Sequence, residues 1–329
     1  MPASPSRPSR RRLLVAGALV ASRPAFAQDA DYPARQPIRL IVTFAPGGGT
    51  DTIARTLNGP LGEVLRQSVV VENRPGAGGT IATDLVAKAP PDGYTVLFTV
   101  SSHSINQALY PRLPFDTERD LRAVALIGEL PQVLAVHPGV PADTLPALVE
   151  LARRDPRFRA YATGGPGSPG HFAGEVFRAR AEVELEHVAY KGAGPAITDV
   201  IGNQVPLFLG TLSGAVPHVK AGRLKAIAVT SEARSPLLPT VPTFAESGWP
   251  GFNMDTWIGM FVPRATPEAV VSRLRRATGA ALQQPAVRER IASQAGRVVD
   301  ADGAVLDARV SAEIREFRAI VQKAGLKPE

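Results

Sequence analysis

The sequence predicts an α/β fold of about two domains, since its 329 residues are about twice the length of a typical domain. Apolar residues make up 44% and charged residues 20% of the chain, a composition that supports a buried core. From residue 37 onward, short apolar runs alternate with segments of helical periodicity. This order is typical of parallel strands joined by helices.

Three strands and two helices are expected in the first 100 residues. Each helix follows a glycine-rich turn that stands directly after a strand, at 45–49 and at 75–80. We expect strands at 38–44, 69–71 and 94–100, a helix at 50–65, and a second helix that carries Ile81, Leu85 and Val86.

The block from about 130 to 230 repeats the alternation of strand and helix. A glycine-rich loop at 163–170 again separates a strand from a helix. We expect helices at 145–153, 171–181, 193–201 and 212–220, and strands at 160–162, 187–190, 205–209 and 224–229.

Two amphipathic helices are expected after a proline-rich passage and a strand at 258–262. The first has Thr266 as its N-cap and Pro267 at its first helical position. The second, at about 305–321, places its apolar residues at helical spacing. We interpret both helices as covers of the core rather than docking surfaces for a partner.

The first 27 residues have the parts of an export signal. A basic stretch at 7–12 precedes an apolar run at 13–21, and an Ala-Phe-Ala site ends at Ala27. The apolar run is shorter than the roughly 20 residues that span a membrane. We therefore expect export and cleavage near Ala27, by the Sec or the twin-arginine route. Without the five arginines of this segment, the formal charge falls from +7 to +2.

Composition and motif spacing exclude or disfavour several classes of function. The chain has no cysteine, which excludes a disulfide scaffold, a thiolate nucleophile and sulfur-ligated metal sites. Its basic residues are interleaved with acids, which disfavours nucleic-acid binding. Its histidines have no metal-ligand spacing, so we expect no metal site. We also expect no cofactor. Thr52 occupies the place of the third glycine of a dinucleotide-binding motif, which disfavours a dinucleotide site. Neither glycine turn continues into Gly-Lys-Ser/Thr, which excludes a Walker A phosphate-binding loop.

Ser168 and His171 are the candidate catalytic pair of an alternative function, a secreted α/β hydrolase. Pro166 stands two residues before Ser168, so the Gly-x-Ser-x-Gly elbow of such enzymes is absent. A histidine three residues away is also seldom the general base of an elbow serine.

The two glycine turns in the first 100 residues are suited to binding an anion. A turn between a strand and a helix presents unpaired backbone N–H groups and the positive end of the helix dipole. Glycine lets a ligand oxygen approach the backbone closely, so two such turns can hold one carboxylate without lysine or arginine. The alternative is that the glycines only form tight turns. The third loop, at 163–170, favours a ligand cleft between domains.

The residues of both turns also carry a family resemblance. Residues 44–51 read FAPGGGTD and residues 72–79 read ENRPGAGG, which resemble the signature loops of the Bug, or tripartite tricarboxylate transporter, periplasmic substrate-binding receptors. The resemblance extends over the rest of the mature chain. Further segments are similar to family motifs in the family's order: PDGYT at 91–95, SHSIN at 102–106, AYKG at 189–192, Asp199, GNQV at 202–205 and LPTVPT at 238–243.

The resemblance implies a two-domain Venus-flytrap fold of the periplasmic binding protein type II class. It places 30–130 and 232–329 in a discontinuous first domain and 131–231 in the second. It implies a periplasmic monomer without catalytic activity, which closes over a small carboxylate and delivers it to a tripartite tricarboxylate-type permease. A sensor kinase is the alternative partner. The ligand is a di- or tricarboxylate, an amino acid or an aromatic acid.

The resemblance also implies which residues contact the ligand. Asp51 is expected to cap its helix, since two carboxylates repel each other. Asp199 is expected to accept a hydrogen bond from a ligand amino group or a water; the alternative is a carboxylate on a helix surface. Phe44 either stacks over the ligand or completes the core. The contacts are Phe44, Gly48, Gly49, Thr50, Asp51, Gly76, Ala77, Gly78 and Gly79 in the first domain, and Thr163, Ser168, His171 and Asp199 in the second.

Overall fold

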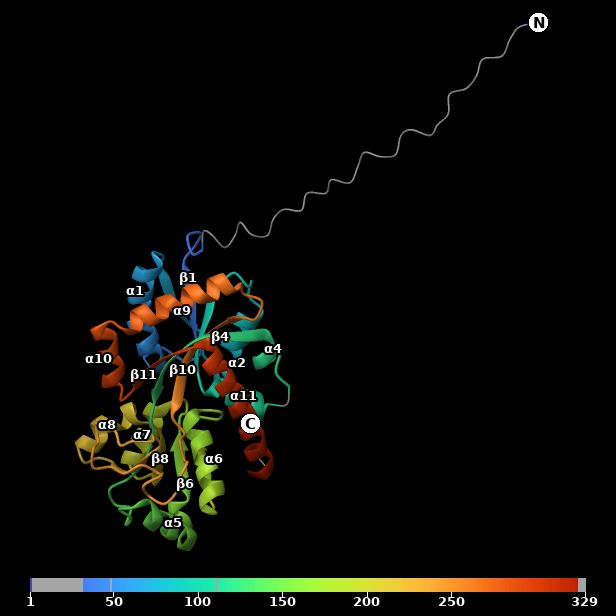
Figure 1. Ribbon diagram of the computed structural model, residues 1–329. Helices are drawn as coiled ribbons and strands as arrows, with labels where there is room; N and C mark the ends of the chain where they lie inside the picture. Colours follow the sequence, from blue (N-terminus) through green and yellow to red (C-terminus); the bar gives the residue numbers. More distant parts are fainter. Residues whose placement is uncertain (2–31, 48, 111, 325–329) are drawn as a thin grey trace.

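Two separate sheets organise the chain into two α/β lobes (Figure 1). The computed structural model describes residue 1 and residues 32–47, 49–110 and 112–324, and every structural statement refers to these. The predicted export signal therefore lies outside the described residues, apart from its first residue. Among the described residues, no helix has the length and apolar character needed to cross a membrane.

The first lobe contains a six-stranded sheet in the order β11-β4-β10-β3-β1-β2. Strand β1 pairs in parallel with β2 and β3, whereas β10 is antiparallel to both β3 and β4. The C-terminal ends of β1, β2, β3 and β4 therefore share one edge. The strands are β1 (Ile38–Val42), β2 (Val69–Asn73), β3 (Thr95–Val100), β4 (Leu121–Leu130), β10 (Thr256–Pro263) and β11 (Arg297–Asp302).

Helices cover both faces of this sheet because its strands are apolar on both sides. Leu40 and Val42 share one core with the helices α1 (Gly49–Leu65), α9 (Glu268–Leu282) and α10 (Pro285–Ser293). Ile41 points the other way, into a core shared with α2 (Thr80–Ala87) and α11 (Gly303–Ala324). The short elements η2 (Ala77–Gly79), α3 (Ser102–Leu109) and α4 (Thr117–Asp120) complete the lobe.

The second lobe has a five-stranded sheet in the order β7-β6-β8-β5-β9. One face packs on α5 (Leu145–Arg154) and α6 (Pro169–Ala181), and the other on α7 (Ala193–Ile201) and α8 (Leu212–Lys220). The strands are β5 (Gln132–Val136), β6 (Ala160–Thr163), β7 (Glu186–Ala189), β8 (Leu207–Thr211) and β9 (Lys225–Val229), and the short helix η3 (Pro156–Phe158) precedes β6.

Two chain crossings lie side by side between the lobes. The first runs from β4 to β5, and the second leaves β9 and returns at β10. Gln132 and Thr230 join them, since Thr230 N–H donates to Gln132 O at 3.0 Å and Gln132 N–H donates to Thr230 Oγ1 at 2.9 Å. After Thr230 the chain stays on the second lobe, where Phe244 and Phe252 are buried in its core.

Helix α11 also joins the lobes. Leu306, Val310 and Ile314 pack on the sheet of the first lobe, whereas Phe317 belongs to the core of the second. The ring of Phe317 lies 4.2 Å from that of Phe172 on α6, measured between centroids. Figure 1 shows α11 extending from the upper lobe to the side of α6. One helix thus contributes to the cores of both lobes.

The prediction that Thr266 caps the first terminal helix is wrong. Helix α9 begins at Glu268, and Pro267 stands in the cap position with an extended ψ of 143°. Because Pro267 is still extended, the helix starts one residue later than predicted, beyond the reach of a Thr266 cap. The Thr266 hydroxyl is buried and has no hydrogen-bond partner among the described residues.

Candidate functional site

Both glycine turns lie at the edge of the first sheet that faces the second lobe. They follow β1 and β2, whose C-terminal ends share an edge with that of β4. The chain enters the second lobe directly from Leu130, the last residue of β4. In open α/β sheets, ligands bind beyond the carboxyl ends of the strands. The topology thus places both turns beside the junction of the lobes.

The first turn is held by the carboxylate of Asp51. Gly47 has a φ of +87° and donates its N–H to Asp51 Oδ2 at 2.9 Å. Arg55 Nε also donates to this carboxylate at 3.0 Å, and Asn73 Nδ2 donates at 2.8 Å. Burial acts to raise the pKa of Asp51, but these hydrogen bonds outweigh it and lower the pKa below its usual value. The contacts occupy Asp51 in shaping the turn, and Gly48 lies outside the described residues.

The second turn has an unusual run of left-handed backbone. Gly76, Ala77, Gly78 and Gly79 have φ values of +129°, +46°, +61° and +101°. A positive φ is uncommon for alanine, and such strain concentrates at functional sites. Gly79 donates its N–H to Gly76 O at 2.9 Å, which closes the turn before α2 begins.

Asn106 on α3 connects the second turn to the other lobe, although sequence analysis did not select it as a site residue. Its Nδ2 donates to Gly78 O at 2.9 Å. Its Oδ1 would lie only 3.2 Å from a Cβ on Gly167, which belongs to the second lobe. Asn106 is 3% exposed, and its Oδ1 has no hydrogen-bond partner in the described part of the chain. Its place in the SHSIN motif was the available signal.

The loop between β6 and α6 faces the second turn from the opposite lobe. Thr163 is fully buried, and its Oγ1 accepts the N–H of Gly165 at 3.1 Å. Gly167 N–H donates to Nδ1 of His171 at 3.2 Å. Ser168 is the N-cap of α6, and its Oγ accepts the backbone N–H of His171 at 3.2 Å. Three of the predicted second-lobe residues therefore meet in one loop, where they bind its backbone.

His187 completes this loop, and sequence analysis did not predict it. Its ring stacks on that of His171 with centroids 4.0 Å apart, and its Nε2 lies 2.7 Å from Thr163 Oγ1. Burial, with a smaller contribution from Arg178, lowers the pKa of His171 to about 4. The pairing of β6 with β7 places His187 opposite Tyr161, a register that the sequence does not reveal.

The remaining predicted residues lie near the two turns or on α7. Phe44 is half-buried against the core of the first lobe, and Thr50 is half-buried in the first turn of α1. Asp199 on α7 accepts a hydrogen bond from the Tyr190 hydroxyl at 2.6 Å. Burial and this hydrogen bond raise the pKa of Tyr190 to about 12. Their roles as ligand contacts stay predictions.

The geometry offers no hydrolase dyad at Ser168 and His171. The Ser168 hydroxyl accepts a backbone N–H, and Nδ1 of His171 is occupied by Gly167. A general base must instead be within hydrogen-bond reach of the hydroxyl proton that it removes. The described residues also contain no cluster of side chains suited to a metal ion.

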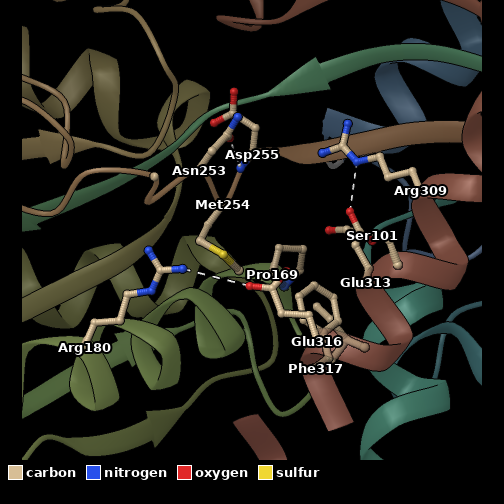
Figure 2. Close-up of a pocket in the computed structure, with 13 residues that line it drawn as sticks. Ser101, Pro169, Arg180, Asn253, Met254, Asp255, Arg309, Glu313, Glu316 and Phe317 are labelled. Carbon is tan, nitrogen blue, oxygen red and sulfur yellow. Dashed lines mark hydrogen bonds and ion pairs between the residues drawn. The ribbon is translucent and has the colours of Figure 1, made fainter. Parts of the chain in front are cut away.

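A cavity of about 240 Å³ lies beside α3, α6 and α11 (Figure 2). Its charged side chains on α6 and α11 pair with one another: Arg309 Nε lies 2.9 Å from Glu313 Oε1, and Arg180 lies 3.9 Å from Glu316. None of the predicted ligand-binding residues that the structure describes lines it. We interpret it as a gap in the packing where α11 crosses between the lobes.

Sequence comparison decides the family of this chain. Residues 53–326 match the model of the tripartite tricarboxylate transporter family receptor. The chain belongs to this family. It is 40% identical over 288 residues to a UPF0065 protein from the tcbD–tcbE intergenic region of Pseudomonas sp. strain P51, covering 86% of this chain and 84% of the relative. It is 37% identical to the protein BugT of Bordetella pertussis, covering 90% and 91%.

Solved structures of receptors in this family have the same fold. MatC from Rhodopseudomonas palustris with bound malate is 32% identical, with a TM-score of 0.80 over 88% of this chain and 99% of that one. An R. palustris protein with adipate is 33% identical, with a TM-score of 0.82 over 91% and 100%. The two-domain fold of periplasmic binding proteins is therefore confirmed. The chain is a solute-binding receptor of this transporter family and not an enzyme, so the hydrolase alternative is set aside.

Proposed function

We propose that this receptor captures a small carboxylate between its lobes and holds it through backbone N–H groups of the two glycine turns. The observation that carries this proposal is the placement of both turns at the sheet edge beside the second lobe. The nearby arginines support backbone recognition, because Arg55 is paired with Asp51 and Arg74 with Glu72. Malate and adipate, bound by two relatives, are both small dicarboxylates.

The second lobe supplies the far wall of this proposed site. Thr163, Ser168 and His171 shape the loop between β6 and α6. Asp199 on α7 accepts a hydrogen bond from the hydroxyl of Tyr190, which precedes that helix. These residues are the proposed determinants of selectivity. Asp199 would accept a hydrogen bond from a ligand amino group or from a bridging water.

Closure is proposed as a hinge motion at the two crossings, with ligand favouring the closed state through contacts to both lobes. The first crossing is placed near Leu130. The domain boundary expected from the sequence for the second crossing lies between 231 and 232, and the domain boundaries stay a prediction. Because Phe244 and Phe252 pack in the second lobe, we now propose the second hinge near Asp255, just before β10.

Release to a tripartite tricarboxylate-type permease follows from the family, and we propose that the protein works as a periplasmic monomer after cleavage near Ala27. A sensor kinase remains the alternative partner. Deleting the permease genes would separate the two partners. Uptake of the ligand is lost if the receptor serves the permease. If the receptor serves only a sensor kinase, uptake persists, and deleting the kinase instead removes a transcriptional response to the ligand.

The first test is native mass spectrometry of the mature protein from its own periplasm, followed by a thermal-shift screen of carboxylates. A co-purifying small acid, or a rise in melting temperature with ligand concentration, supports the proposal. No bound mass and no shift across dicarboxylates, tricarboxylates, amino acids and aromatic acids would contradict it.

Gly78→Val tests the backbone grip directly. A Cβ there would lie 3.0 Å from Asn106 Oδ1 on a backbone with a φ of +61°, so valine would displace the second turn, and we expect binding to be abolished. Gly222→Val is the matched control, since Gly222 has a φ of +67°, close to the +61° of Gly78, in an open turn away from the site. It carries the same backbone strain and should bind normally. Equal ligand affinity in both variants would contradict the proposal that the two glycine turns bind the carboxylate.

A further inference from the structure

Two stacked histidines link the anchors of the second-lobe loop at 164–168. Gly165 N–H is bound by Thr163 Oγ1, and Gly167 N–H is bound by Nδ1 of His171. His187 connects the two anchors, because it contacts Thr163 through Nε2 and stacks on His171. We propose that His171 and His187 are positioning residues that hold this loop in its ligand-binding conformation only while His171 is neutral. The inference rests on the proposed function of the site.

The chemistry of the two rings assigns the sensitive position to His171. A neutral imidazole has one accepting and one donating nitrogen, whereas an imidazolium has two donors. Since Nδ1 of His171 accepts from Gly167, its protonation would aim one donor at another. His187 differs, because the Thr163 hydroxyl can donate or accept and so suits either protonation state. Protonation of His171 alone therefore breaks an anchor of the loop.

The groups packed around His171 favour its neutral form. Glu175 and Arg178 on the same helix pair with each other at 2.7 Å, and Tyr161 on β6 donates to Glu175 at 2.6 Å. His187 on β7 is the titratable group across the stack, and two cations with ring centroids 4.0 Å apart would repel each other. Burial and Arg178 lower the pKa of His171 to about 4. His171 is thus neutral at the pH where a carboxylate ligand is ionised.

A displaced loop would weaken the second-lobe side of the site. Gly167 approaches Asn106, and Asn106 holds the second glycine turn through Gly78. Loss of the Gly167 anchor therefore loosens the contact between the two loops across the lobe junction. We expect the dissociation constant to rise about fivefold to tenfold as His171 is protonated, the effect of one net hydrogen bond.

The variant His171→Asn tests this inference. Asparagine Oδ1 occupies nearly the position of Nδ1, so it can accept from Gly167 and does not titrate. Each protein is compared with its own affinity at pH 7.5, and we expect His171→Asn to lose less affinity than wild type between pH 7.5 and pH 3.5, with malate and adipate as probes. His171→Leu, which offers no acceptor to Gly167, should bind more weakly than wild type at pH 7.5 and should lack the loss that follows from His171 protonation. Protonation of the ligand itself affects all proteins equally and cancels in the comparison.

His137→Asn is the matched control for this experiment. Nδ1 of His137 also accepts a glycine N–H, that of Gly139 at 3.0 Å, but at the far end of β5. This variant should keep the wild-type pH profile. Circular dichroism at each pH confirms that every protein remains folded. Identical pH profiles for wild type and His171→Asn would overturn the inference.

A ligand-free measurement separates this inference from the proposed function. In wild-type protein, NMR should show the Gly167 amide shifting and exchanging faster with the same midpoint as the His171 ring. In His171→Asn this coupled change should disappear. A Gly167 amide that ignores the titration of His171 would overturn the positioning role. Failure to bind any carboxylate, with the coupled change intact, would instead contradict the proposed function.

Discussion

Asp51 shows at the scale of a single residue how a buried carboxylate can organise the turn that we propose as part of the anion site. Only 3% exposed, it accepts hydrogen bonds from Gly47, Arg55 and Asn73. The negative charge of Asp51 is paired with the positive charge of Arg55, so the carboxylate repels a nearby anion less. The same contacts join the first turn to β2, the strand that leads into the second turn. The geometry of one turn thus depends on the other.

We expect Asp51→Asn to lower the free energy of unfolding by about 1–3 kcal/mol, the cost of leaving buried hydrogen-bonding groups unsatisfied. The amide offers one acceptor where the carboxylate offers two, so the N–H of Gly47 and the side chain of Arg55 compete for it. Urea unfolding at pH 7.5 measures the effect. Asp143→Asn, at an exposed ion pair with Lys225, is the control and should change stability by less than about 1 kcal/mol. Equal effects in both variants would contradict the role of Asp51.

Asp255 gives a pH dependence at the second crossing. Burial raises its pKa to about 6, with Glu129 adding to the rise and the Thr230 hydrogen bond opposing it. Because the folded-state pKa lies above the unfolded value, the folded protein holds a proton that the unfolded chain has lost. This group therefore makes the protein less stable as pH rises from about 4 to about 6, by about 1–3 kcal/mol.

Asp255→Asn should remove that loss. The amide oxygen can still accept from the Thr230 hydroxyl, which lies 2.8 Å from Asp255 Oδ1. We expect the variant to be more stable than wild type at pH 7.5 and equally stable at pH 4. Urea midpoints measured at both values decide the matter. A constant difference between the two proteins at every pH would contradict the titration of Asp255.

At the scale of elements, α11 packs against both lobes. Phe317→Ala should cost about 3–5 kcal/mol, the usual effect of removing a buried phenylalanine. Its ring fills space beside Phe172, where α6 meets α11. Val305→Ala on the same helix is the control, since Val305 is 53% exposed and should change stability by about 0.5 kcal/mol or less. Thermal unfolding compares the two, and a small effect of Phe317→Ala would show that α11 does not join the lobes.

The elements that the sequence predicts well have a clear periodicity of apolar residues or a glycine turn that marks where they begin. The glycine turns mark the starts of α1 and α2, and the helices α5, α7 and α8 agree with their apolar periodicity. By contrast, β4, β5, α3, α4, α10 and β11 were not predicted. Helix α3 is polar in sequence yet buried, and β11 is a half-buried edge strand with charged ends. Local periodicity carries little signal for such elements.

The sequence indicates the proposed site only where the backbone itself is the proposed binding group. Glycine, which a tight turn or a close approach requires, marks the two turns in the sequence. Asn106 and His187 act through neighbours far away in the chain, on Gly78 and Thr163. Such contacts depend on strand register and on how the lobes meet. Neither can be derived from residue types and spacing alone.

At the scale of the whole molecule, the two lobes are coupled even without a ligand. The crossings are hydrogen-bonded to each other through Gln132 and Thr230, and α11 contributes to both cores. A ligand held by turns from one lobe and a loop from the other adds a third connection. Ligand binding should therefore stabilise both lobes together rather than the one that supplies the anion grip.

This coupling predicts the thermal response to a bound carboxylate. At a free ligand concentration 100 times the dissociation constant, linkage adds about 2.7 kcal/mol. At about 2–4 °C for each kcal/mol, the melting temperature should rise by about 5–10 °C. Calorimetry should show every unfolding transition moving upward, and Gly78→Val should show no movement. A ligand that shifts one of two resolved transitions and leaves the other in place would mean that it binds a single lobe, and closure over it would then have no energetic basis.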